Sequence, residues 1–343
     1  MRNRLFAALL PLCLLLSACG GEKDPSGGLL ESASGLPEET VLVTVGGREV
    51  AAWQYLYWLA FTCDQLQARY DGAGLELDWA APLEGGTLAD YAKDQALADA
   101  ALYAVVENWA EQYGAVLGEA DSGALAEAWT EKTASYGGEE QYLAALGNLG
   151  LNRARAEALS RVGQLYGKLY ELYGADDGPL TPDPADLAAF AREQGWLTVD
   201  RALIPIGADR SEAQAKAAEI FSRLNQAPDK AEAFPALAAE GDDSAGPRTF
   251  LAGDGTLPAA LEEAAAALEP GQCSGILESG EGFSILLRCE TNPQDVREEY
   301  FDYILQEAAK NAQVELTEAY RALDAAAFAG NLAKAREALG ENG

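Results

Sequence analysis

The sequence predicts an α+β protein in which helical segments flank a module of mixed strands and helices. Apolar residues recur at the spacing of a helix across residues 51–173. Turn-forming residues crowd 174–184, and beyond them short apolar runs of the kind found in strands alternate with helical segments. The helical spacing returns after Pro293. These two changes of period predict the domain organisation.

The first residues carry the pattern of an export signal. Arg2 and Arg4 precede an apolar run that is too short to span a bilayer as a helix. The run ends in Leu-Ser-Ala-Cys at residues 16–19, which resembles the lipobox of bacterial lipoproteins. The resemblance implies that a signal peptide, residues 1–18, is removed and that Cys19 becomes the lipid anchor. The alternative is an ordinary signal peptide with a chance cysteine.

The elements that follow, up to residue 173, are mainly helical. Residues 19–40 are rich in Gly, Ser, Pro and Glu, so we expect a lipidated flexible spacer there. A strand is predicted at 41–45, with a tight turn at Gly46 and Gly47. Helices are then predicted over residues 51–70, 87–113, 122–136, 139–146 and 152–173. Several of these helices carry aromatic residues on one face, a pattern that core packing explains better than a cofactor site does.

The sequence beyond the 174–184 linker predicts a compact α+β module that is followed by a further helical segment. A short helix at 186–193 precedes the module. The expected elements of the module are a strand at 199–206, helices at 211–224, 231–239 and 258–268, and a β-hairpin within 271–290. A helix at 295–311, a short strand at 313–316 and a final helix follow. We therefore expect a helical domain over 41–194, the module over 195–291, and a C-terminal helical segment over 292–343.

The composition excludes several classes of function. The chain has 24 basic and 55 acidic residues, a formal net charge of −31, so it repels phosphate backbones and we expect no nucleic-acid partner. It contains no histidine, which excludes Ser-His-Asp and Cys-His catalysis and the usual zinc sites. The cysteines lack metal-ligand spacing, and no glycine-rich phosphate loop is present. We therefore expect neither a metal nor a cofactor.

Several short motifs follow one another in the predicted module. They are Arg201-Ala-Leu-Ile-Pro-Ile in the first strand, Phe234-Pro-Ala-Leu-Ala-Ala-Glu in a helix, Gly246-Pro-Arg-Thr-Phe, Leu268-Glu-Pro-Gly-Gln-Cys-Ser-Gly and Gly282-Phe-Ser-Ile-Leu-Leu. The series resembles the parvulin family of peptidyl-prolyl isomerases across residues 199–290. The whole plan, with helical segments around such a module and a lipoprotein signal before it, resembles the PrsA/SurA-type extracytoplasmic foldases.

The resemblance implies a fold and a function for the whole chain. The N-terminal helices and the C-terminal segment would pack into one chaperone lobe, with the parvulin-like module inserted between them. The protein would assist the folding of unfolded or partly folded exported polypeptides, from a lipid anchor on the extracytoplasmic face of the cell membrane. The alternative is a catalytically inactive holdase. A solute-binding lipoprotein fits poorly, because residues 51–173 lack the alternating strands and helices of that class.

The resemblance also assigns an active site, in which this chain departs from the family. The family's two histidines fall at Leu203 and Ser284, and its acidic or thiol group falls near Asp243. Prolyl isomerisation breaks no bond and requires only a lower C–N rotation barrier, so we expect reduced activity, with complete inactivity as the alternative. Asp243 is the candidate catalytic residue, and the alternative for it is an exposed loop carboxylate.

The substrate-binding residues that the resemblance implies are apolar. Phe250, Leu257, Leu261 and Phe283 could form the pocket that holds the proline ring. The alternative is that all four side chains fill the core of the module.

Cys273 and Cys289 form a candidate disulfide. If Glu278 faces Phe283 across a hairpin turn, antiparallel pairing brings Cys273 to within a residue of facing Cys289. The compartment outside the membrane permits oxidation. The alternative is two buried free thiols, because a slip of one residue in the register points the two side chains to opposite faces.

Overall fold

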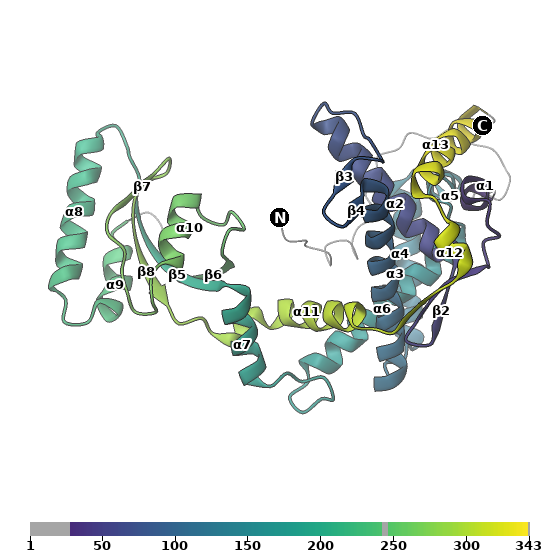
Figure 1. Cartoon of the computed structure of the whole chain (residues 1–343). Coiled ribbons are helices and arrows are strands. Elements are labelled where there is room, and N and C mark those ends of the chain that lie inside the picture. Colours follow the sequence, from purple (N-terminus) through teal and green to yellow (C-terminus); the bar gives the residue numbers. More distant parts are fainter. Residues whose placement is uncertain (1–27, 242–245, 342–343) are drawn as a thin grey trace. The chain divides into compact units, whose positions relative to one another are not determined.

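The computed structural model describes residues 28–241 and 246–341, and these divide into two compact units (Figure 1). The first unit, which we call the lobe, contains the chain up to Thr181 and again from Asp302. The second, which we call the module, is Pro182–Phe301. The predicted fold class is confirmed, because both ends of the chain form one mainly helical lobe and a unit of mixed strands and helices is inserted between them.

A small antiparallel sheet joins the two ends of the chain within the lobe. Strand β1 (Val41–Val45) lies between β2 (Arg48–Ala51) and β9 (Val314–Leu316). The turn between β1 and β2 contains Gly46 and Gly47, both at positive φ, as a tight hairpin turn requires. The predicted strands at both ends are thereby confirmed.

Helices make up the rest of the lobe, apart from a two-residue hairpin of β3 (Pro82–Leu83) and β4 (Gly86–Thr87). They are α1 (Leu29–Ser34), α2 (Ala52–Gly72), α3 (Leu88–Tyr113), α4 (Glu119–Ser135), α5 (Glu139–Gly147), α6 (Arg153–Gly174), α12 (Glu318–Ala322) and α13 (Ala325–Glu341). Helix α1 corrects the predicted flexible spacer over 19–40, because Leu29 and Leu30 are buried and α1 packs against α13. The central helix α2 is buried along much of its length against α3. Thr87 caps the N-terminus of α3: its hydroxyl accepts the Asp90 amide, and the Asp90 carboxylate accepts the Thr87 amide.

Side chains also tie the C-terminal segment to α2 and α3. The Arg336 guanidinium binds the Asp64 carboxylate through two contacts of 2.7 and 2.9 Å. Lys93 Nζ donates to the backbone carbonyl oxygens of Tyr320 and Leu323, at 3.2 and 2.8 Å. Within the described residues, no helix is both long enough and apolar enough to cross a bilayer.

The module is built on a four-stranded antiparallel sheet in the order β6-β5-β8-β7. The strands are β5 (Trp196–Ile204), β6 (Arg248–Leu251), β7 (Leu277–Ser279) and β8 (Gly282–Cys289). The helices are α7 (Pro184–Gln194), α8 (Arg210–Gln226), α9 (Lys230–Ala238), α10 (Ala259–Ala266), the 3₁₀ turn η2 (Pro293–Val296) and α11 (Arg297–Lys310), which ends in the lobe.

Each face of the module's sheet has its own apolar core, because side chains alternate between the faces of a strand. Helices α8 and α9 cover the face that carries Ile204, Phe283 and Ile285. Helix α10 covers the opposite face, with Phe250 and Leu286 (Figure 1).

The module extends beyond the predicted boundaries of 195 and 291. Helix α7, which the sequence analysis assigned to the N-terminal helical domain, packs against β5 and η2. Its side chains Leu187 and Phe190 are buried, and the Phe190 ring lies 5.2 Å from that of Tyr300. The compact unit therefore begins at Pro182 and ends at Phe301.

Candidate functional site

The two positions that the family's histidines would occupy face each other in the module. Strands β5 and β8 are antiparallel, and their register pairs Leu203 with Ser284. Ser284 is fully buried, and its hydroxyl oxygen accepts a hydrogen bond of 3.0 Å from Nε of Arg201. The structure therefore brings together a leucine, a serine and a neighbouring guanidinium at the two positions that the sequence analysis assigned to the family's histidines.

Arg201 is a buried cation that the sequence analysis did not assign to the site. The residue is 8 % exposed. Its Nη2 lies 2.7 Å from Oε2 of Glu281, and the two groups form an ion pair without a hydrogen bond. Guanidinium groups stay protonated in proteins, so this centre cannot exchange protons as an imidazole does. The signal in the sequence was the position of Arg201, two residues before Leu203 in an apolar strand and therefore on the same face.

Three of the four predicted pocket residues come together, and the fourth does not. Phe250, Leu257 and Leu261 share one core with Leu286 under α10. Phe283 lies on the opposite face, under α8 and α9, because it neighbours Ser284 in the strand. The three grouped side chains are at most 6 % exposed, which matches the core alternative more closely than an open pocket.

Glu262 fixes the loop that carries Leu257. This glutamate on α10 is only 5 % exposed, and its two carboxylate oxygens accept the backbone amides of Gly253 and Leu257, at 2.8 and 2.9 Å. The contacts join residues five and nine positions apart across a loop. Sequence reasoning missed Glu262, since an acid in the first turn of a helix is usually exposed.

The candidate disulfide is not formed, and Cys273 and Cys289 are free thiols in the structure. Glu278 faces Phe283 as predicted, but the pairing shifts by one residue farther along, so that Cys273 faces Leu287. Cys289 is then a diagonal neighbour rather than the opposite residue. Both thiols pack against the α8 and α9 core, and burial raises the pKa of each.

The remaining predicted site residues, Cys19 and Asp243, lie outside the described residues. In the part of the chain that the structure describes, no group of three or more Cys, Asp or Glu side chains could hold a metal ion.

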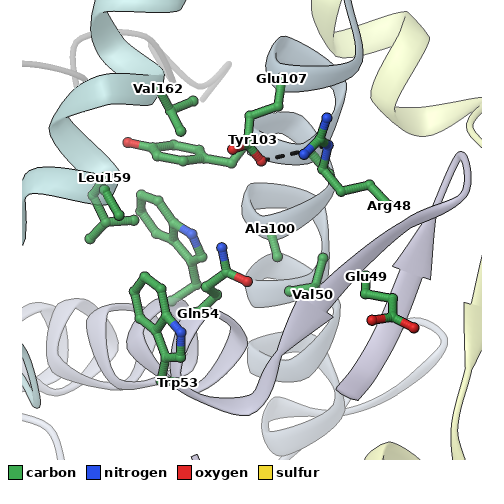
Figure 2. A pocket seen from close by; sticks show the side chains of 13 residues that line it. Arg48, Glu49, Val50, Trp53, Gln54, Ala100, Tyr103, Glu107, Leu159 and Val162 are labelled. Carbon is green, nitrogen blue, oxygen red and sulfur yellow. Dashed lines mark ion pairs between the residues drawn. The ribbon is translucent and has the colours of Figure 1, made fainter. Parts of the chain in front are cut away.

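The lobe contains a pocket of about 440 Å³, including the open solvent at its mouth (Figure 2). Aromatic residues Trp53, Trp58 and Tyr103 contribute to its walls, and polar residues contribute to its rim. The full lining comes from β2, α2, α3 and α6: Arg48, Glu49, Val50, Trp53, Gln54, Trp58, Ala100, Tyr103, Ala104, Glu107, Ala158, Leu159 and Val162. The sequence analysis assigned the aromatic stripes to the core and did not predict this pocket.

The charges at the rim are balanced locally. Nε of Arg48 donates to Oδ1 of Asn108 at 2.9 Å and lies 3.7 Å from Oε2 of Glu107, the ion pair drawn in Figure 2. Another nitrogen of Arg48 pairs with Glu111. Burial raises the pKa of Glu107, although Arg48 acts in the opposite direction.

Comparison with known proteins identifies the module. Residues 197–299 match the model of the PPIC-type PPIase domain, which confirms the resemblance to parvulins for this segment. No curated protein matches the chain.

Among solved structures, three that are similar to this chain have low sequence identity to it. Foldase protein PrsA from Streptococcus pneumoniae is 16 % identical, with 75 % of this chain and 92 % of that chain covered and a TM-score of 0.26. PrsA from Bacillus subtilis is 18 % identical, with 76 % and 92 % covered and a TM-score of 0.26. A structure of SurA-like chaperones from Campylobacter jejuni is 10 % identical, with 81 % and 99 % covered and a TM-score of 0.22.

Proposed function

We propose that this protein, whose residues 197–299 form a PPIC-type PPIase domain, is a foldase that assists exported polypeptides and has reduced isomerase activity. The observation that carries the proposal is the pairing of Leu203 with Ser284 inside that domain. The scaffold of the isomerase is present, but its two imidazoles are replaced by a buried Ser284–Arg201 contact.

Physical chemistry favours weak catalysis over none. Rotation about the prolyl C–N bond meets a barrier of about 18–20 kcal/mol, and catalysis requires only that the twisted amide bind more tightly than the planar one. An apolar surface that holds the ring can contribute without proton transfer. Here Phe250, Leu257 and Leu261 are buried in the core, so little of their surface is available to a ring. We assign Asp243 as the residue that makes a polar contact with the substrate's prolyl amide.

We further propose that the protein acts on the extracytoplasmic side of the cell membrane, held there by a lipid on Cys19. The support is the export signal and the Leu-Ser-Ala-Cys sequence at 16–19. Metabolic labelling with a lipid precursor tests the proposal. The wild type should be labelled and Cys19→Ala should not, whereas equal labelling of both would refute the anchor.

Two assays on the same full-length preparation test the proposed function. The first is protease-coupled isomerisation of a proline tetrapeptide, in which we expect a rate above the uncatalysed one but below that of a histidine-containing parvulin. The second is suppression of aggregation of a chemically unfolded client, which we expect at stoichiometric amounts of protein. A rate equal to that of a histidine-containing parvulin would contradict the reduced activity, and unchanged aggregation would contradict the chaperone role.

The second candidate function is a holdase without isomerase activity. The packing of Phe250, Leu257 and Leu261 against one another and Leu286 under α10 favours it, since these side chains already fill the core of the module. An isomerisation rate equal to the uncatalysed one, together with suppressed aggregation, would select this candidate.

A further inference from the structure

The pocket of the lobe combines aromatic walls with hydrogen-bond donors. Trp58 and Tyr103 pack edge to face, with ring centroids 4.8 Å apart, and Trp53 lies on the same helix as Trp58. Figure 2 shows Trp53, Gln54 and Tyr103 gathered around the pocket, with Leu159 and Val162 of α6 beside them. Such a surface suits a compact apolar ring, because aromatic faces and edges pack closely against rings.

Three N–H donors in this lining have no acceptor among the described residues. They are the indole N–H groups of Trp53 and Trp58 and the side-chain amide NH₂ of Gln54. The oxygen of Gln54 already accepts the Ala51 amide at 3.0 Å, so its NH₂ group is the part left for a ligand. Each of the three nitrogens keeps contact with solvent, because none of them is both fully buried and without a partner.

The acceptors at the rim, by contrast, are engaged or solvated. Glu107 pairs with Arg48, and Glu49 is exposed at the edge of the sheet. The interior of the pocket therefore favours an occupant that brings hydrogen-bond acceptors and few donors of its own. An ordinary peptide residue brings an N–H group, for which the aromatic walls offer the Tyr103 hydroxyl as their one acceptor, and burying that N–H without a partner is costly.

A proline residue fits these requirements. It has no backbone N–H, its ring is apolar and compact, and its own carbonyl and the preceding one remain free to accept hydrogen bonds. Proline-containing segments are also pre-extended, so they lose less conformational entropy on binding, and aromatic-lined grooves in other proteins recognise them for this reason.

We propose that this pocket binds an X-Pro segment of an unfolded polypeptide, with the proline ring against Trp53, Trp58 and Tyr103 and its carbonyl oxygens toward the unpaired N–H donors. The inference rests on the proposed function for its source of ligand, since a foldase meets unfolded chains. It adds that the lobe itself selects proline-containing segments, independently of the PPIC-type PPIase domain.

The test uses the full chain and resolves the lobe from the module. The protein has six tryptophans, of which Trp196 belongs to the module, so the indole N–H signals of a ¹⁵N NMR spectrum report separately on the two units. The probes are a capped pentapeptide with a central Ala-Pro, and the same peptide with N-methylalanine or alanine in place of proline. N-methylalanine lacks the N–H but has no ring, so it separates the two requirements.

We expect the indole signals of Trp53 and Trp58 to shift with the proline peptide, and the alanine peptide to bind at least about tenfold more weakly. N-methylalanine should lie between them. Equal affinity for all three peptides, or shifts confined to Trp196, would overturn the proposal.

Two variants test the donors, of which Gln54→Glu is isosteric and Trp58→Phe also removes one ring. Gln54→Glu keeps the oxygen that accepts the Ala51 amide but removes the NH₂ group, and its matched control is Gln65→Glu, an exposed position on the same helix. Trp58→Phe removes one indole N–H, and its matched control is Trp129→Phe, outside the pocket.

Both pocket variants should weaken the proline peptide by about three- to tenfold relative to their controls. Should Trp58→Phe fail to fold, Gln54→Glu decides alone. Binding that is unchanged in the pocket variants, while aggregation is still suppressed, refutes the inference and leaves the proposed function standing. A proline preference at Trp53 and Trp58, without isomerase or chaperone activity, supports the inference and refutes the proposed function.

Discussion

Replacing Glu262 by glutamine should loosen the loop over residues 253–257 without unfolding the module. The carboxylate accepts the amides of Gly253 and Leu257 at 2.8 and 2.9 Å, and the residue is 5 % exposed. Glutamine keeps one acceptor oxygen and turns an NH₂ group toward the other amide. Hydrogen bonds to charged groups contribute about 1.5–3 kcal/mol each, so the loss of one should raise the local opening constant between about tenfold and about a hundredfold.

Hydrogen exchange followed by mass spectrometry measures this opening directly. Peptides that contain residues 253–257 should exchange faster in Glu262→Gln by that factor, because local opening governs their protection. The matched control is Glu263→Gln, which makes the same change of charge at the exposed neighbouring position. Equal exchange in the two variants would show that the Glu262 contacts do not hold the loop.

Three further predictions concern the module and the lobe. The double variant Leu203→His, Ser284→His should raise the isomerisation rate of a proline tetrapeptide, because the two positions are cross-strand partners. An unchanged rate would show that the closed apolar core limits catalysis instead. Burial raises the pKa of Asp99 to about 6, so the folded state binds its proton more tightly than the unfolded state does, and stability falls as pH rises from about 4 to about 6. Asp99→Asn should therefore raise the free energy of unfolding of the lobe, measured with urea, by up to about 3 kcal/mol at pH 7 and by nothing near pH 4. A gain in stability that is independent of pH would contradict this cause. Cys273 and Cys289 should both alkylate completely in protein unfolded without reductant, since the structure holds them as free thiols, and a protected pair would show that a bridge forms.

The sequence was most informative where the contacts are local. The pairing of Glu278 with Phe283 across a hairpin turn was predicted correctly, and so was a helix from residue 87, where Thr87 caps α3. The disulfide prediction extended that register four residues too far. The pairing shifts by one residue near Ser274, whose hydroxyl accepts the Leu286 amide and donates to the Gly275 carbonyl. A side-chain hydrogen bond to a distant strand leaves no periodic signal in the sequence.

The site was only partly predictable for a related reason. Family resemblance assigned Leu203 and Ser284 to the site and Phe283 to the pocket, although Phe283 and Ser284 are adjacent residues of a strand and point to opposite faces. Because side chains on the same face of a strand are two residues apart, strict use of this period would have placed Phe283 and Ser284 on opposite faces. The partners of Arg201 and Glu262 depend on how strands and loops pack, and pairwise contacts of this kind between distant residues are not encoded in local spacing.

The pairing of β1 with β9 imposes an order on folding. The Thr317 hydroxyl donates to the Leu42 carbonyl across 275 positions of sequence, so the lobe cannot complete its sheet until nearly the whole chain is available. The module has no such requirement, because its strands all lie within residues 196–289. In a chain that becomes available from its N-terminus, β1 would keep an unpaired edge while the module forms. Contacts between distant segments form slowly, and unpaired strand edges promote association. A protein proposed to protect other unfolded chains would thus itself pass through an exposed state until the residues of β9 are available.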